Sequence, residues 1–359
     1  MQRTTLLVPF LGASLAVALA AACGSESKPQ QTTPVAQEPA PAPQAAPEPA
    51  PQPAPAPEPA APTFLTGKWV WFELRTTDVE KSKAFYSELL GWQIESQEMA
   101  GMKAELVKAG GKDIATITPA EGKAKSHWVP FVSVPDVDAA VKSIEEQKGK
   151  VVKPATDIPQ IGRFAIVSDP TGAEFAVFKG VNSDPPDPPA PVSGTFMWNE
   201  YLAKNKKQHA AALAFYPAAL GFTTSQMQMG EGKKKSSYDM LSFGETARAG
   251  VTAAKPASMG GQWLPWVAVD DIDSLPAKVK TLKGKVLVKP NDIPSVGRAM
   301  VVADSTGAAL GLLKAAPMGE QGAQPGAAQP PAGGAQPAPG AQPAPGAQPA
   351  QPAPAPEKK

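Results

Sequence analysis

The sequence has very few residues of two kinds that often carry chemistry. Cys23 is the only cysteine, so no disulfide can form within the chain, and His127 and His209 are the only histidines. A catalytic zinc site needs three protein ligands, so a role at the surface or in helix packing is expected for each histidine. The sequence also has no Ser-His-Asp or Cys-His arrangement and no glycine-rich phosphate loop. Its formal net charge is +1, with acids and bases interspersed, which indicates no nucleic-acid partner.

The first 22 residues have the pattern of an export signal. A short basic region ending at Arg3 precedes an apolar run, interrupted by Pro9, that ends in three alanines before Cys23. This run is shorter than the roughly 20 residues of a membrane-spanning helix, which argues against an uncleaved anchor. The alanines and the cysteine resemble a bacterial lipobox, which implies a lipid on Cys23 and attachment to the cell envelope. The next residues, Gly24 and Ser25, include no aspartate, which favours the outer membrane, facing the periplasm or the cell surface.

The 43 prolines are concentrated towards the two ends of the chain. Such segments bury too little apolar surface to offset the entropy lost on ordering, so they are expected to be disordered. The sequence predicts a signal peptide over 1–22, a proline- and alanine-rich tether over 23–63, a domain over 64–180, a proline-rich linker over 181–193, a second domain over 194–316, and a disordered tail over 317–359.

An internal repeat relates the two predicted domains. The segment Asp157–Arg163 returns 135 residues later as Asp292–Arg298, and Trp71-Phe72-Glu73 returns as Trp198-Asn199-Glu200. The chain therefore carries two tandem copies of one unit.

Each copy divides again into two similar halves. Period-two alternation predicts a strand over Trp69–Thr76, followed by Asp78 as the N-cap of a helix over Val79–Leu90. In the second half, Asp136 caps a helix predicted over Val137–Gln147. The further strands of the first copy are predicted around Met102–Val107, Ile114–Ile117, His127, Val151–Val152, Arg163–Ser168 and Glu174–Phe178.

This order, with Asp78, Phe85-Tyr86, Leu90-Gly91-Trp92 and the turn Asp169-Pro170-x-Gly172, resembles the vicinal oxygen chelate superfamily. The superfamily contains glyoxalase I, bleomycin-resistance proteins and ring-cleaving dioxygenases. The resemblance covers both copies. It implies an α+β fold in which paired βαβββ modules form a concave mixed sheet that holds the substrate, with helices on the convex side.

Enzymes of this superfamily bind a divalent metal through inward-facing strand residues. The resemblance locates three such positions per copy: Trp71, Val129 and Ala176 in the first, and Trp198, Leu264 and Gly311 in the second. None of these side chains can ligate a metal, and the fourth position, near 114–117 or 250–253, offers only aliphatic, small or hydroxyl residues. We therefore expect no metal, no cofactor and no catalytic residue, which argues against an enzyme.

Strand alternation places Trp71, Glu73 and Arg75 on the concave side of the first copy. An aromatic cup with a carboxylate could hold a small aromatic or cationic molecule, and the first copy is the better candidate. In the alternative reading, the tryptophans fill the space of the lost metal while Glu73 pairs with Arg75 or Arg163. The candidate ligand-binding residues are Trp71, Glu73, Phe131 and Glu174 in the first copy, and Trp198, Glu200 and Trp266 in the second.

Three functions remain open on the sequence alone. A lipid-anchored protein that binds a small molecule without turnover fits the cup and the missing ligands. A structural or protein-interaction lipoprotein fits the long tether and tail. A metal-dependent lyase or dioxygenase fits only the fold. The partners expected are the small molecule, a membrane reached through Cys23, and each domain for the other.

Overall fold

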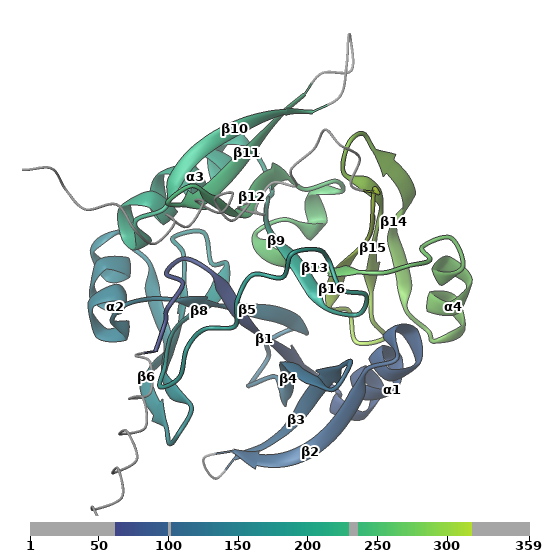
Figure 1. Cartoon of the computed structure of the whole chain (residues 1–359), viewed down its shortest axis with the longest axis horizontal. Helices are drawn as coiled ribbons and strands as arrows, with labels where there is room; N and C mark the ends of the chain where they lie inside the picture. The colour runs from purple at the N-terminus through teal and green to yellow at the C-terminus, as the bar shows by residue number, and fades with distance from the viewer. Residues whose placement is uncertain (1–61, 100–101, 230–235, 318–359) are drawn as a thin grey trace, which may run out of the picture. The chain divides into compact units, whose positions relative to one another are not determined.

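A computed structural model describes residues 62–99, 102–229 and 236–317 (Figure 1). They lie within the compact unit that begins at Pro59. The predicted signal peptide, Cys23, nearly all of the tether and nearly all of the tail lie outside the described residues. In the part of the chain that is described, no helix is long and apolar enough to cross a membrane.

The first copy folds into one mixed eight-stranded sheet of order β2-β3-β4-β1-β5-β8-β7-β6. β1 pairs in parallel with β4 and antiparallel with β5, so the two halves join at the centre. The elements are β1 (Trp69–Thr76), α1 (Val79–Leu90), β2 (Gln93–Met99), β3 (Met102–Ala109), β4 (Lys112–Pro119), β5 (His127–Ser133), α2 (Val137–Glu146), β6 (Lys150–Ile158), β7 (Gly162–Ser168) and β8 (Glu174–Gly180).

The second copy repeats this topology in the order β10-β11-β12-β9-β13-β16-β15-β14. The predicted fold class, two curled mixed sheets built from paired βαβββ modules, is confirmed. The elements are β9 (Phe196–Ala203), α3 (Lys206–Leu220), β10 (Thr223–Met229), β11 (Ser236–Phe243), β12 (Thr246–Ala253), the 3-10 turn η2 (Ala257–Met259), β13 (Gln262–Ala268), α4 (Leu275–Thr281), β14 (Lys285–Ile293), β15 (Gly297–Ala303) and β16 (Ala309–Ala315).

Side-chain caps fix where the helices begin. The Asp78 carboxylate accepts a hydrogen bond from the Lys81 amide, and the Asp136 carboxylate accepts one from the Ala139 amide, as the sequence predicts. Asn205 caps α3 in the same way. α4 is shorter and begins one turn later than its counterpart α2, so Asp271 does not cap it.

The helix-bearing faces of the two sheets pack against each other. One buried cluster joins the second half of the first copy to the first half of the second, with Phe175 beside Tyr216, and a second cluster joins the remaining halves. α2 lies beside α3, and α1 beside α4 (Figure 1). At the centre, the rings of Phe72 and Phe196 stack with centroids 3.9 Å apart. This packing leaves the opposite, cupped face of each sheet for a site.

Candidate functional site

The cupped face of the second sheet holds a pocket of about 120 Å³. Its walls are mainly apolar, with three methionines and two indoles around one carboxyl group. The lining residues are Met197, Trp198, Glu200, Met227, Met229, Tyr238, Trp266, Ile293, Ser295, Val296 and Leu313. The three second-copy candidates from the sequence, Trp198, Glu200 and Trp266, are therefore brought together in one pocket.

Among the residues that line this pocket, Glu200 alone carries a carboxyl group. Its side chain is buried, and its Oε2 accepts a hydrogen bond of 3.1 Å from the Trp266 indole N–H. Burial raises the pKa of the Glu200 carboxyl to about 7, although hydrogen bonds from Tyr238 and Trp266 act in the opposite direction. Near neutral pH this carboxyl therefore exists in both the charged and the neutral form.

Tyr238 connects Glu200 to the second indole. The Trp198 indole N–H donates to the Tyr238 oxygen at 3.0 Å, which leaves the Tyr238 hydroxyl proton for Glu200. Tyr238 lies on β11, next to β12 in the sheet, and its ring fits there because residue 250 is glycine: a Cβ on Gly250 would lie 1.7 Å from the Tyr238 hydroxyl oxygen. At the corresponding positions the first copy has Ala104 and Thr116.

Gly311 makes room for Trp266 in the same way. A Cβ on Gly311 would lie 2.3 Å from the nearest indole atom of Trp266. Gly311 is where the resemblance to the superfamily locates a metal-ligand position, and in this copy an indole ring lies against that residue. Trp198 and Leu264 hold the other two positions that the resemblance locates. These side chains do not fit a divalent metal, and within the described ranges no group of three or more His, Cys, Asp or Glu side chains is placed to hold one.

The cupped face of the first sheet is packed differently. Phe131, Phe164 and Phe178 cluster there, with Phe131 and Phe164 stacked at 5.8 Å and Trp71 packed against the group. Alanine and leucine stand at the positions of Phe164 and Phe178 in the second copy, as Ala299 and Leu313. The smaller side chains leave open in the second cup the space that phenylalanine rings fill in the first.

The charged candidates of the first cup are bound to one another. Glu73 accepts a 2.6 Å hydrogen bond from Thr118 and lies 3.8 Å from Arg75. Arg75 also lies 3.6 Å from Glu174, which is 3.1 Å from the Nε2 of His127. Glu73 therefore pairs with Arg75, one of the two partners that the sequence suggests for it if the first cup binds no ligand.

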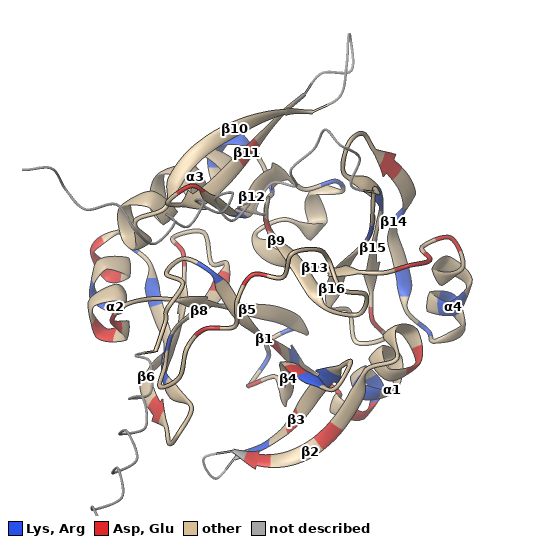
Figure 2. Cartoon of the chain, in the orientation of Figure 1, with Lys and Arg blue, Asp and Glu red and all other residues tan. Residues whose placement is uncertain are grey.

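The other charged residues and the second histidine considered from the sequence lie away from the centres of both cups. Arg163 is not near Glu73; it pairs with Asp138 and Asp157 at 2.9 and 3.0 Å. Arg298 makes the equivalent pairs in the second copy. His209 lies on α3, 3.2 Å from Asp239. Basic and acidic residues are spread over both sheets (Figure 2).

Sequence reasoning missed Tyr238 and the three methionines of the second cup. Only Tyr238 left a signal, because the exchange of Ala104 and Thr116 for a tyrosine and a glycine is visible once the strands are aligned. The methionines have no polar group and no repeat counterpart that marks them.

A family model described as the Glyoxalase/Bleomycin resistance protein/Dioxygenase superfamily matches residues 68–177 and 200–312. The chain belongs to this superfamily. CFP32 of Mycobacterium tuberculosis, which carries a provisional glyoxylase name, is 34% identical to it over 253 residues, covering 69% of this chain and 94% of the relative. DnrV of Streptomyces peucetius, named as an anthracycline biosynthesis protein, is 28% identical over 270 residues, covering 70% of this chain and 94% of the relative.

Among solved structures, the Mn(II)-bound glyoxalase from Novosphingobium aromaticivorans is 17% identical, with a TM-score of 0.46, and the match covers 70% of this chain and 83% of that one. The superfamily membership expected from the sequence is confirmed by the family model and the relatives.

Proposed function

We propose that this chain is a lipid-anchored envelope protein whose second domain binds a flat aromatic molecule without turning it over. The observation that carries the proposal is the buried Glu200 carboxyl in a cup of indoles and methionines. Aromatic and thioether walls favour planar, polarisable ligands, and a single carboxyl group orients them. Two relatives are named for the biosynthesis of anthracyclines, which are planar aromatic compounds, and this supports the ligand class.

The charge of Glu200 sets which aromatic ligands bind well. When ionised, the carboxylate attracts a cationic ring, and the indoles of Trp198 and Trp266 add cation–π attraction of about 0.5–2 kcal/mol. When protonated, it can only donate or accept a neutral hydrogen bond. We expect flat cations to bind more tightly than their neutral counterparts once the pH exceeds the Glu200 pKa.

Two matched probes test this site. N-methylquinolinium is a flat cation, and quinoline is its uncharged counterpart at mildly alkaline pH. Equilibrium titration followed by tryptophan fluorescence should give saturable binding of N-methylquinolinium, weaker binding of quinoline, and loss of both in Trp266→Leu. Trp71→Leu in the first cup is the matched control and should retain binding. Loss of binding in Trp71→Leu together with full binding in Trp266→Leu would place the site in the first domain and contradict the proposal.

A proton-transfer enzyme is the second candidate, because a carboxyl with a pKa of about 7 suits a general base. The two functions differ in what the bound molecule undergoes. The protein is incubated with its ligand in heavy water, and the recovered ligand is analysed for deuterium bound to carbon. If the wild type introduces deuterium and Glu200→Gln does not, the protein is an enzyme, and the proposal of binding without turnover is wrong.

The lipid anchor is proposed from the sequence around Cys23 alone. Cys23→Ser should release the protein from the membrane fraction into the soluble fraction, because the thioether to the lipid cannot form. Ser25→Ala is the control and should stay with the membranes. Fractionation followed by immunoblotting measures both, and membrane association that survives Cys23→Ser would contradict the anchor.

A further inference from the structure

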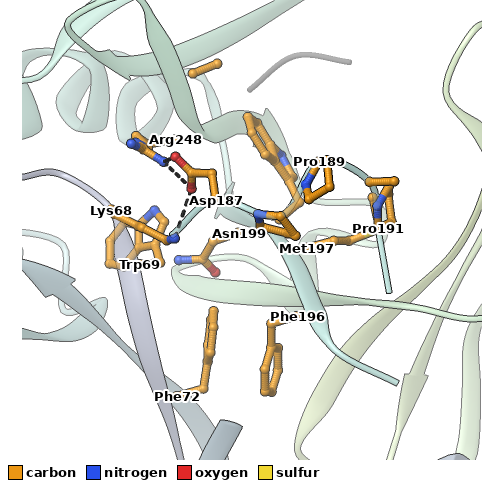
Figure 3. A pocket seen from close by; sticks show the side chains of 14 residues that line it. Lys68, Trp69, Phe72, Asp187, Pro189, Pro191, Phe196, Met197, Asn199 and Arg248 are labelled. Carbon is orange, nitrogen blue, oxygen red and sulfur yellow. Dashed lines mark hydrogen bonds and ion pairs between the residues drawn. The ribbon is translucent and has the colours of Figure 1, made fainter. Parts of the chain in front are cut away.

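We infer that a second binding site, for a single-ring aromatic carboxylate carrying an N–H or O–H donor, lies at the junction of the two domains. A cavity of about 140 Å³ lies there beneath the linker between the copies (Figure 3). That is close to the size of cavity that holds one benzene ring. Its apolar walls come from Phe72, Phe196, Met197 and the linker prolines Pro188, Pro189 and Pro191.

Three side chains of this cavity carry buried polar atoms that have no hydrogen-bond partner among the residues that the structure describes. They are the Trp69 indole Nε1, the Arg248 Nε, and both the Oδ1 and the Nδ2 of Asn199. Asn199 is fully buried. Each unpaired buried group costs free energy, and native proteins leave few of them. Three such side chains in the wall of one cavity indicate a ligand that forms the missing hydrogen bonds.

The repeat shows that this polarity is specific to the second copy. Asn199 stands where the first copy has Phe72, and strand register aligns Arg248 with Ile114. In the first copy Phe72 fills its space by stacking on Phe196. Two apolar-to-polar exchanges thus converge on one cavity, and the smaller Asn199 leaves the room that a phenylalanine would occupy.

The charges of the cavity favour an anion. Asp187 of the linker pairs with Lys68 at 3.0 Å and accepts two hydrogen bonds from Arg248 Nη1 at 2.8 and 2.9 Å (Figure 3). Among the residues that line the cavity, two cations stand against one carboxylate, a net charge of +1, and the carboxylate of Asp184 near Lys68 reduces this excess. The Asp187 bonds also fix the Arg248 guanidinium, so its free Nε–H is held in place for an acceptor.

The hydrogen-bonding groups define the ligand further. Trp69, Arg248 and the Asn199 amide nitrogen supply donors, which a carboxylate satisfies with its two oxygens. The Asn199 Oδ1 supplies an acceptor, which requires a donor on the ligand. A planar ring bearing a carboxylate and a neighbouring N–H meets these demands and lies between the proline and phenylalanine walls.

Two acids that differ in one atom test the site on the full-length protein. Pyrrole-2-carboxylate carries the ring N–H, and furan-2-carboxylate has an oxygen in its place. Isothermal titration should show binding of the pyrrole acid and about tenfold weaker binding of the furan acid, because the latter leaves the Asn199 Oδ1 unpaired. Failure of the pyrrole acid to bind, or equal binding of the two acids, would overturn the inference.

Variants assign the effect to these residues. Asn199→Leu, close in shape, should abolish the preference for the pyrrole acid, and Arg248→Lys should weaken both acids while preserving a cation beside Asp187. A preference that persists in a folded Asn199→Leu protein contradicts the site, and Arg248→Lys decides the question if the first variant does not fold. Glu200→Gln should leave acid binding intact while changing N-methylquinolinium binding, so failure of one site is distinguishable from failure of the other.

Discussion

Single glycines decide the shape of the second cup. Gly311 and Gly250 each lie against an aromatic ring that would overlap a Cβ at that position. The first copy has Ala176 in place of Gly311 and the smaller Phe131 in place of Trp266. The methyl group of Ala176 is therefore one of several differences in side-chain volume that separate the two kinds of cup.

Gly311→Ala should displace the Trp266 indole and break its hydrogen bond to Glu200. We expect a loss of N-methylquinolinium binding and a fall in the free energy of unfolding of about 1–3 kcal/mol, the usual cost of overpacking. Fluorescence titration and chemical denaturation measure the two effects. Ala176→Gly in the first copy should leave probe binding unchanged; equal binding by Gly311→Ala would mean that the indole position does not matter.

Glu200 should also make the stability of the protein depend on pH. Its pKa of about 7 lies above the ordinary value of 4.5, so between these two pH values the folded chain binds more protons than the unfolded chain. Stability from this group is therefore full below about pH 4.5 and is lost as the pH rises to about 7.

Glu200→Gln removes this dependence. The unfolding free energy of the variant relative to the wild type should therefore be higher at alkaline than at acidic pH by on the order of 3 kcal/mol. Burial, the largest single effect, lowers the pKa of His127, but the hydrogen bonds to Glu174 and to the Lys125 carbonyl and the charge of Glu174 together raise it. Stability from His127 is therefore also lost as the pH rises. The quantity to measure is therefore the difference in unfolding free energy between the variant and the wild type across pH. A difference that is constant with pH would show that Glu200 titrates normally.

At the scale of elements, two equivalent turns, Asp169–Gly172 before β8 and Asp304–Gly307 before β16, tie each sheet to the other. Asp304 accepts hydrogen bonds from the Thr306 and Ala308 amides of its own turn and one of 3.0 Å from Ser82 on α1 of the first copy. Asp169 occupies the equivalent turn and contacts Tyr216 on α3. The turn that marks the family in the sequence also joins the domains.

Asp304→Ala should lower the free energy of unfolding by roughly 3 kcal/mol or more, because several hydrogen bonds to a buried carboxylate are lost together. Asp292→Ala is the matched control: it removes an exposed pair with Arg298, whose contribution should be about 0–1 kcal/mol. Chemical denaturation of both variants decides the point. Equal effects would show that the turn does not hold the domains together.

Sequence patterns predict these elements well where the physics is local. Alternation and caps predict β1, α1 and α2 to within a residue at their ends, because an N-cap aspartate and a period of two depend only on neighbouring residues. The edge strand β2 carries no such alternation, so the sequence does not predict its position. β6 extends well beyond the two valines that indicated it.

The site depends on how much of each cup the side chains fill, and no local sequence pattern encodes that volume. The concave position of Trp71, Trp198 and Glu200 follows from alternation. The sequence favours the first cup on the residues of a few strands, and these do not reveal that Phe164 and Phe178 pack on its floor. Whether an aromatic residue lines a pocket or fills it is decided by volumes contributed by several strands at once.

At the scale of the whole molecule, the two domains share their cores. Both large buried clusters contain residues of both copies, so separation would expose them to water. The fragment 62–193 should therefore not behave as a monodisperse monomer. Size-exclusion chromatography with light scattering tests this; a monomeric fragment that unfolds as cooperatively as the full chain would show that the domains fold independently.

The affinity of N-methylquinolinium as a function of pH tests the central claim most directly. If the ionised Glu200 carboxylate receives the cation, the affinity should be constant above the pKa of about 7 and should fall by about tenfold for each pH unit below it. Glu200→Gln should bind weakly at every pH. Absence of binding at alkaline pH, or tight binding that does not change between acidic and alkaline pH, would contradict the assignment of the second cup as the ligand site.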